Sequence, residues 1–138
     1  MRYPVLALLL ASVAMAQTGP VSVSSNHRYF QTANGRPFFW LADTGWLMFE
    51  KLDRADAERY LEDRRQKGFN VIQVMVLHVA AAKNIYGQTA LISSDPARPN
   101  LDGGDENYWR HMDWMIDLAA TKGIYIAMVP AWGDLAKK

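Results

Sequence analysis

Two strand-like apolar runs of this sequence each lead into a tryptophan and an aspartate. The first run leads into Asp43 and Trp46, and the second leads into Trp132 and Asp134. A carboxylate accepts hydrogen bonds from hydroxyl groups, and an indole offers a flat apolar face beside a polar N–H edge. Side chains of these two kinds suit a polyhydroxylated ring, so we expect these four residues to help form a carbohydrate-binding rim.

Two further polar residues are candidates for the same site. Gln73 lies within the apolar run 69–77, where a buried amide without a partner would cost about 1–3 kcal/mol. We expect it either to tie the sheet together or to point into a ligand cavity. His78 follows this run directly and is either a ligand contact or a solvated histidine. No other histidine lies at metal-ligand spacing, so the sequence predicts neither a metal site nor a cofactor.

The start of the 138-residue chain has the three parts of a secretory signal peptide, residues 1–16. Arg2 gives the positive end, Val5–Val13 is shorter than the ~20 residues of a membrane span, and Ala14–Ala16 fits a cleavage motif. Loss of Arg2 leaves equal numbers of basic and acidic residues. That balance argues against nucleic-acid or membrane partners, and we expect a secreted or periplasmic protein that does not associate with the membrane after cleavage.

Strands and helices alternate in the predicted pattern. A hairpin is expected where Asn34-Gly35 separates two strand-like runs. Each expected helix ends at a Lys-Gly pair, and a buried strand follows at once. This order indicates parallel pairing. The expected elements are the hairpin strands 29–32 and 37–41, helices 53–67 and 107–122, and strands 69–77 and 124–130.

Two architectures share this pattern. A doubly wound sheet usually has a glycine-rich turn after its first strand, whereas 42–46 contains one glycine. A (β/α)8 barrel has its longest loops after the strands, as the segment 78–104 would be. We favour an α/β fold: strands one to three of a (β/α)8 barrel, preceded by the hairpin. A whole barrel takes about 250 residues, so we expect 17–27 to be an arm and 28–138 a catalytic domain truncated at its C-terminus.

The triplet Asp43-Thr44-Gly45 also occurs in aspartic proteases, where two such loops place two carboxylates around one water. Here the bulky Trp46 follows the glycine, where those enzymes carry a small residue, and the surrounding pattern is not all-β. The protease is therefore an unfavoured alternative, since a triplet without its structural context has little specificity. Asp43 also has the simpler interpretation of a turn or helix-capping aspartate.

Three stretches resemble the apiosidase-like glycoside hydrolases: 34–46, 67–73 and 130–133. The resemblance spans roughly residues 28–134. It implies a (β/α)8 enzyme that hydrolyses glycosidic bonds of plant cell-wall polysaccharide and releases a branched pentose such as apiose from pectin side chains. It also implies a pair of carboxylates at the ends of strands four and seven. No residue of this chain matches that pair, so we expect the catalytic residues beyond Lys138.

What the resemblance transfers to this chain is a substrate-binding shell. Its members would be Asp43, Trp46, Gln73 and Trp132, with His78 and Asp134 as further contacts. We expect the chain alone to be inactive and only marginally folded, because an open parallel sheet leaves strand edges unpaired. The alternative from another class is a non-catalytic module that binds carbohydrate or matrix through the same aromatic rim.

Overall fold

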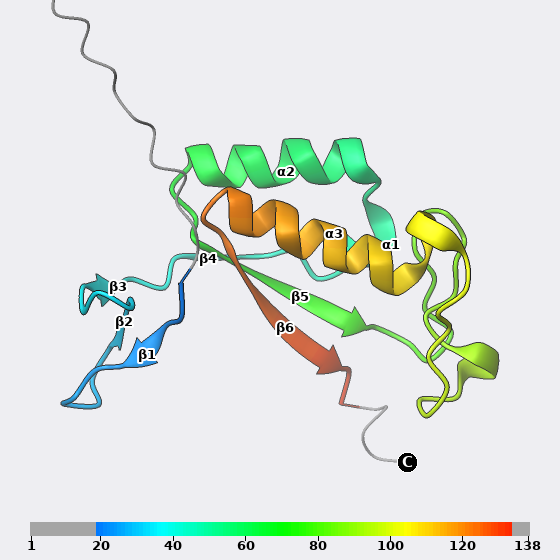
Figure 1. Ribbon diagram of the computed structural model, residues 1–138, viewed down its shortest axis with the longest axis horizontal. Coiled ribbons are helices and arrows are strands. Elements are labelled where there is room, and N and C mark those ends of the chain that lie inside the picture. Colours follow the sequence, from blue (N-terminus) through cyan, green and yellow to red (C-terminus); the bar gives the residue numbers. More distant parts are fainter. Residues whose placement is uncertain (1–18, 134–138) are drawn as a thin grey trace, which may run out of the picture.

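The computed structural model describes residues 19–133, so the expected signal peptide and Asp134 lie outside the described residues. The chain forms an antiparallel sheet, β1-β2-β3, and a parallel sheet, β4-β5-β6 (Figure 1). The elements are β1 Ser22–Val23, β2 Phe30–Gln31, β3 Pro37–Phe38, β4 Ala42–Thr44, α1 Met48–Lys51, α2 Arg54–Gln66, β5 Val71–Leu77, the 3-10 turns η1 Ile92–Ser94 and η2 Gly104–Glu106, α3 Tyr108–Thr121, and β6 Tyr125–Ala131. The predicted mixed α/β fold is confirmed.

Helices α2 and α3 lie side by side over the parallel sheet (Figure 1). From β5, Ile72 and Val74 point towards them and are fully buried. The buried helix residues of this core are Met48, Phe49, Ala57, Leu61, Met112, Met115 and Ala119. Because side chains alternate along a strand, Gln73 and Met75 point the other way. We call that side the far face of the sheet.

A side-chain cap begins each of the two long helices. Asp53 caps α2 by accepting a hydrogen bond from the Asp56 N–H at 2.7 Å. Asn107 caps α3 by accepting from the Trp109 N–H at 2.9 Å. Such caps satisfy donors that the first turn of a helix leaves free. No helix within residues 19–133 is both long enough and apolar enough to cross a membrane.

The segment predicted as one strand into Asp43 is divided in the structure. β3 pairs within the antiparallel sheet, whereas β4 pairs with β5. Asn70 holds the break between them: its side chain accepts from the Leu41 N–H at 3.0 Å and donates to the Phe39 carbonyl at 2.7 Å. Asp43 therefore lies within β4 rather than after a strand end.

The prediction that 124–130 forms a buried strand is correct for its position and wrong for its burial. Met128 of β6 is 52% exposed. The reason is that β6 is an edge strand of the parallel sheet within the described residues. The antiparallel sheet also has a strand that was not predicted, β1, which falls in the segment expected to be an arm.

Candidate functional site

Trp46 and Trp132 meet beyond the carboxyl ends of β4 and β6. Their ring centroids are 6.0 Å apart and the ring planes are inclined at 87°, an edge-to-face contact. The two side chains are 39% and 50% exposed, so each retains indole surface that a ligand can reach. A cavity of about 170 Å3 adjoins them, and its lining residues are Trp46, Leu47, Met75, His78 and Trp132.

The main chain of β5 fixes the position of Trp46. The Gly45 N–H donates to the Gln73 carbonyl at 3.0 Å, and the Met75 N–H donates to the Trp46 carbonyl at 3.0 Å. These bonds extend the β4–β5 ladder past Thr44, the last residue of the strand. Trp46 is therefore held at the sheet edge by hydrogen bonds and is not carried on a free loop.

The structure brings three of the six predicted site residues to this cavity: Trp46, His78 and Trp132. His78 is exposed, directly after β5. Gln73 is half-buried on the far face. It lies two residues before Met75 in β5, so the two side chains are on the same face. Its side chain therefore points to the side of the sheet on which the cavity lining residue Met75 lies. Asp134 is outside the described residues.

Asp43 points towards the helices and is held by the protein's own donors. The Tyr60 hydroxyl donates to its Oδ2 at 2.9 Å, Arg64 Nε donates to the same oxygen, and the Thr44 N–H donates to Oδ1 at 2.7 Å. Burial acts to raise the pKa of Asp43, but these hydrogen bonds outweigh it and hold the pKa below its ordinary value. Burial and the nearby Asp43 carboxylate raise the pKa of Tyr60 to about 12.

The sequence predicts part of the surroundings of Asp43. The spacing of α2 places Ala57, Tyr60, Leu61 and Arg64 on one helical face, and Ala57 and Leu61 are indeed fully buried. Tyr60 and Arg64 were therefore expected to face the sheet, although no sequence pattern pointed to Asp43 as their partner. A second cavity of about 350 Å3 borders this cluster, with Asp43, Trp46, Lys51, Tyr60 and Arg64 among its lining residues.

Sequence reasoning missed two buried polar side chains near α1. His111 is fully buried on α3, and its Nε2 lies 2.9 Å from the Leu52 carbonyl, so Nε2 carries the proton and Nδ1 is left without a partner among the described residues. Burial lowers the pKa of His111. Glu50 also has a buried Oε1 for which residues 19–133 provide no partner. The position of His111 one place before Met112, on the apolar face of α3, is the one feature of the sequence that pointed to its burial.

Several solved structures are similar to the chain over most of its length. One, a glycoside hydrolase, is 45% identical over 86% of this chain with a TM-score of 0.77. Another, a glycoside hydrolase family 5 protein from Bacteroides vulgatus ATCC 8482, is 41% identical over 86% of this chain with a TM-score of 0.79. A third, from the same strain, is 17% identical with a TM-score of 0.58 and shows the fold alone. No curated protein matches the chain.

The chain spans only 27% and 26% of the first two of these structures. The sequence model described as "Apiosidase-like, catalytic domain" matches residues 24–138, which includes both tryptophans of the rim and the strands that carry them. By that match and by its similarity to glycoside hydrolases, this chain belongs to the apiosidase-like catalytic domain family.

Proposed function

We propose that this chain is part of a secreted or periplasmic glycoside hydrolase that acts on plant cell-wall polysaccharide, with apiose-bearing pectin side chains as the substrate. Membership of the apiosidase-like family supports hydrolysis of a glycosidic bond. The observation that carries the proposal is the Trp46–Trp132 rim, with its adjoining cavity, at the carboxyl ends of parallel strands. In (β/α)8 barrels this edge of the sheet is where substrates bind.

The parallel sheet is proposed to be the first three strands of such a barrel. Its helices lie on one face (Figure 1), as the outer ring of a barrel requires, and its far face carries Gln73 and Met75. In a closed barrel the far face would become the interior. The ends of β4, β5 and β6 would then form one part of the mouth, where Trp46, His78 and Trp132 gather.

Within that mouth each residue has a distinct task. One indole presents an apolar face to a sugar ring, while the ring hydroxyls reach the polar groups around it. His78 can donate or accept a hydrogen bond at the cavity wall. Gln73 offers both a donor and an acceptor from the far face. These tasks are recognition and orientation rather than bond cleavage.

Glycosidic cleavage in the family's mechanism takes two carboxylates, one as acid/base and one as nucleophile. Asp43 is a poor candidate for either, because Thr44, Tyr60 and Arg64 occupy its oxygens. We therefore expect the purified chain to bind carbohydrate without turning it over. Release of reducing sugar by the pure chain, free of contaminating hydrolase, would contradict that expectation.

The proposal is tested by titrating the chain with apiose-containing pectin oligosaccharide while recording tryptophan fluorescence. We expect a saturable change, because two partly exposed indoles line the site. Oligosaccharides of the same length without apiose are the control. Equal binding of both oligosaccharides would support a carbohydrate site but contradict apiose-bearing pectin as its substrate. It would favour a general glycan-binding module.

A further inference from the structure

We propose that Asp43 is a positioning residue: from the helix side of the sheet it holds the turn that presents Trp46 to Trp132. Under this proposal Asp43 does not make the ligand contact expected from the sequence, but acts on the ligand indirectly through Trp46. The importance of this role for sugar binding rests on the proposed function. The positioning itself does not, and it can be measured without any ligand.

The first step of the argument is the attachment of β4 to α2. Asp43 receives hydrogen bonds from Tyr60 and Arg64, which lie one helical turn apart. The Arg64 guanidinium is itself fixed, because it pairs with Asp63 at 2.6 Å and lies 4.9 Å from the centre of the Tyr60 ring and 5.6 Å from that of Phe69. The carboxylate thus faces a preformed pair of donors rather than mobile surface side chains.

The second step is the contact between this cluster and the turn. A Cβ placed on Gly45 would lie 3.1 Å from the Tyr60 hydroxyl oxygen and 3.0 Å from Ile72 Cγ2. The Tyr60 hydroxyl that donates to Asp43 therefore lies in the space that a side chain at position 45 would occupy, close beside the turn. A shift of Tyr60 would therefore change the packing against Gly45, the residue before Trp46.

The third step is the rigidity of the turn itself. Asp43 accepts from the Thr44 N–H through its other oxygen, at 2.7 Å. The Gly45 carbonyl accepts from the Met48 N–H at 2.9 Å, and the Trp46 carbonyl accepts from Met75 at 3.0 Å. The turn is tied to the carboxylate before it, the helix after it and the strand beside it. Loss of the carboxylate removes the first of these ties.

The test uses the edge-to-face indole pair as its own reporter. Two coupled indoles give an exciton band in the far-ultraviolet circular dichroism spectrum, and loss of that band in Trp132→Phe identifies it. We expect Asp43→Asn to lower the band by at least half, because an amide cannot accept from all three donors. Tyr60→Phe should lower it by less, since the ring stays and one hydrogen bond is lost.

Lys122→Met is the matched control. It removes ion pairs between α2 and α3, so it weakens the fold, but it contacts neither Asp43 nor the turn. Spectra are compared at a temperature where melting curves show every variant folded. The control should keep the full band. If Asp43→Asn keeps the full band as well, or if Lys122→Met loses as much, the positioning role is overturned.

Two further outcomes are decisive. If Asp43→Asn does not fold, Tyr60→Phe decides the question: a folded Tyr60→Phe protein with an unchanged band contradicts the proposal, and a diminished band supports it. If the band falls in Asp43→Asn while the unaltered chain binds no oligosaccharide, the positioning role stands and the proposed carbohydrate site fails. The two ideas can therefore be rejected separately.

Discussion

The edge of one rim indole meets the face of the other, Trp46 against Trp132, with 6.0 Å between ring centroids, although β5 separates the strands that carry them. Two strand spacings amount to about 9.6 Å, so the side chains lean towards each other across the end of β5. The two residues remain 39% and 50% exposed, so the contact leaves indole surface available to a ligand. It also makes the rim a joint product of two strands, which neither tryptophan would form alone.

Removal of either rim tryptophan should weaken carbohydrate binding about tenfold. Burial of roughly 60 Å2 of apolar sugar surface on one indole is worth about 1.5 kcal/mol, and 1.4 kcal/mol is a factor of ten in Kd. Calorimetric titration of Trp46→Ala and Trp132→Ala measures this. Trp40→Ala is the control, because Trp40 is also partly exposed but packs against Phe30 and Phe38 of the hairpin. An equal loss in the control would mean that the rim is not the site.

Asn107→Ala should destabilise the chain more than Asp53→Ala, although both residues cap helices. Asp53 makes one capping bond, so its loss costs about 1 kcal/mol. Asn107 is 1% exposed, and its amide also donates to the Asn100 and Asp102 carbonyls at 2.8 and 2.5 Å. Leaving these buried groups unpaired should bring the loss to about 2–3 kcal/mol. Urea unfolding compares the two, and equal losses would contradict the assigned double role.

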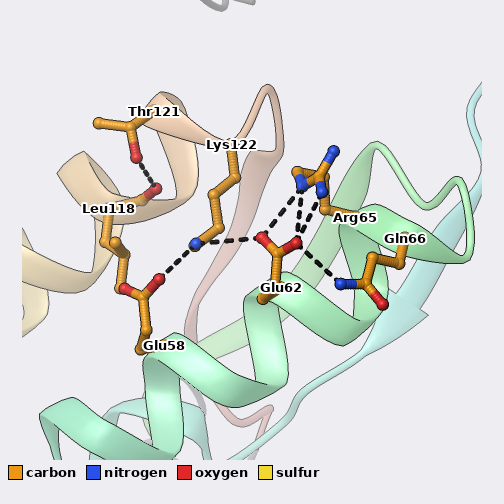
Figure 2. A network of polar contacts seen from close by, with 7 residues as sticks. All are labelled: Glu58, Glu62, Arg65, Gln66, Leu118, Thr121 and Lys122. Atoms are coloured by element: carbon orange, nitrogen blue, oxygen red, sulfur yellow. Dashed lines mark hydrogen bonds and ion pairs between the residues drawn. The ribbon is translucent and has the colours of Figure 1, made fainter. Parts of the chain in front are cut away.

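Lys122→Met should lower Tm by about 3 °C, more than Lys67→Met does. Lys122 bridges the two helices, with Nζ 2.5 Å from Glu58 and 3.3 Å from Glu62, and its side chain is only 12% exposed (Figure 2). Lys67 pairs with Asp63 within α2 and is more exposed. The comparison is made by thermal melting at low salt. High salt should reduce both effects, and a larger effect of Lys67→Met would contradict the prediction.

The same cluster predicts a loss of stability in acid. The Arg65 hydrogen bond is the largest of several, with Gln66 and Lys122, that lower the pKa of Glu62 from 4.5 to about 2 (Figure 2). A depressed carboxyl pKa stabilises the fold above the unfolded value, so this contribution is lost as pH falls from about 4.5 towards 2. Glu62→Gln should show a shallower fall in Tm across that window. An identical slope in both proteins would contradict it.

His111 predicts a second, milder window. Burial holds the pKa of His111 below 6.5; among the charges that face it from α2 and its cap, Arg54 lowers the pKa and Asp53 raises it. Below about pH 6.5 the unfolded chain takes up a proton that the folded chain resists, so stability falls as pH drops. His111→Gln should remove that dependence, which sets in as the pH falls below 6.5. His78→Gln, at an exposed position, should retain it, and the reverse result would refute the assignment.

The helices and their caps could be predicted because the information is local. Asp53 and Asn107 stand where a cap should stand, and each helix ends at a Lys-Gly pair. The direction of Asp43 could not be predicted, because a shift of one residue in the pairing of β4 with β5 reverses every side chain. That register depends on Asn70, which holds the chain break at Leu41 from 29 residues away. The residues around Asp43 carry no sequence signal for this long-range contact between Asn70 and Leu41.

The candidate site was predictable to a similar extent. Tryptophans at two strand ends indicated a shared rim, and the structure brings them into contact with His78 beside them. The cluster of Asp43 with Tyr60 and Arg64 depends on how α2 packs on β4, which is a tertiary property.

Saturation-transfer NMR on apiose-containing pectin oligosaccharide with the folded chain tests the central claim most directly. The claim predicts that the sugar-ring protons receive saturation from the unaltered chain and from Trp40→Ala. It also predicts that they receive none from the double variant Trp46→Ala/Trp132→Ala. Equal transfer from the double variant, or none from the folded unaltered chain, would contradict the claim that this pair of indoles is a carbohydrate-binding rim.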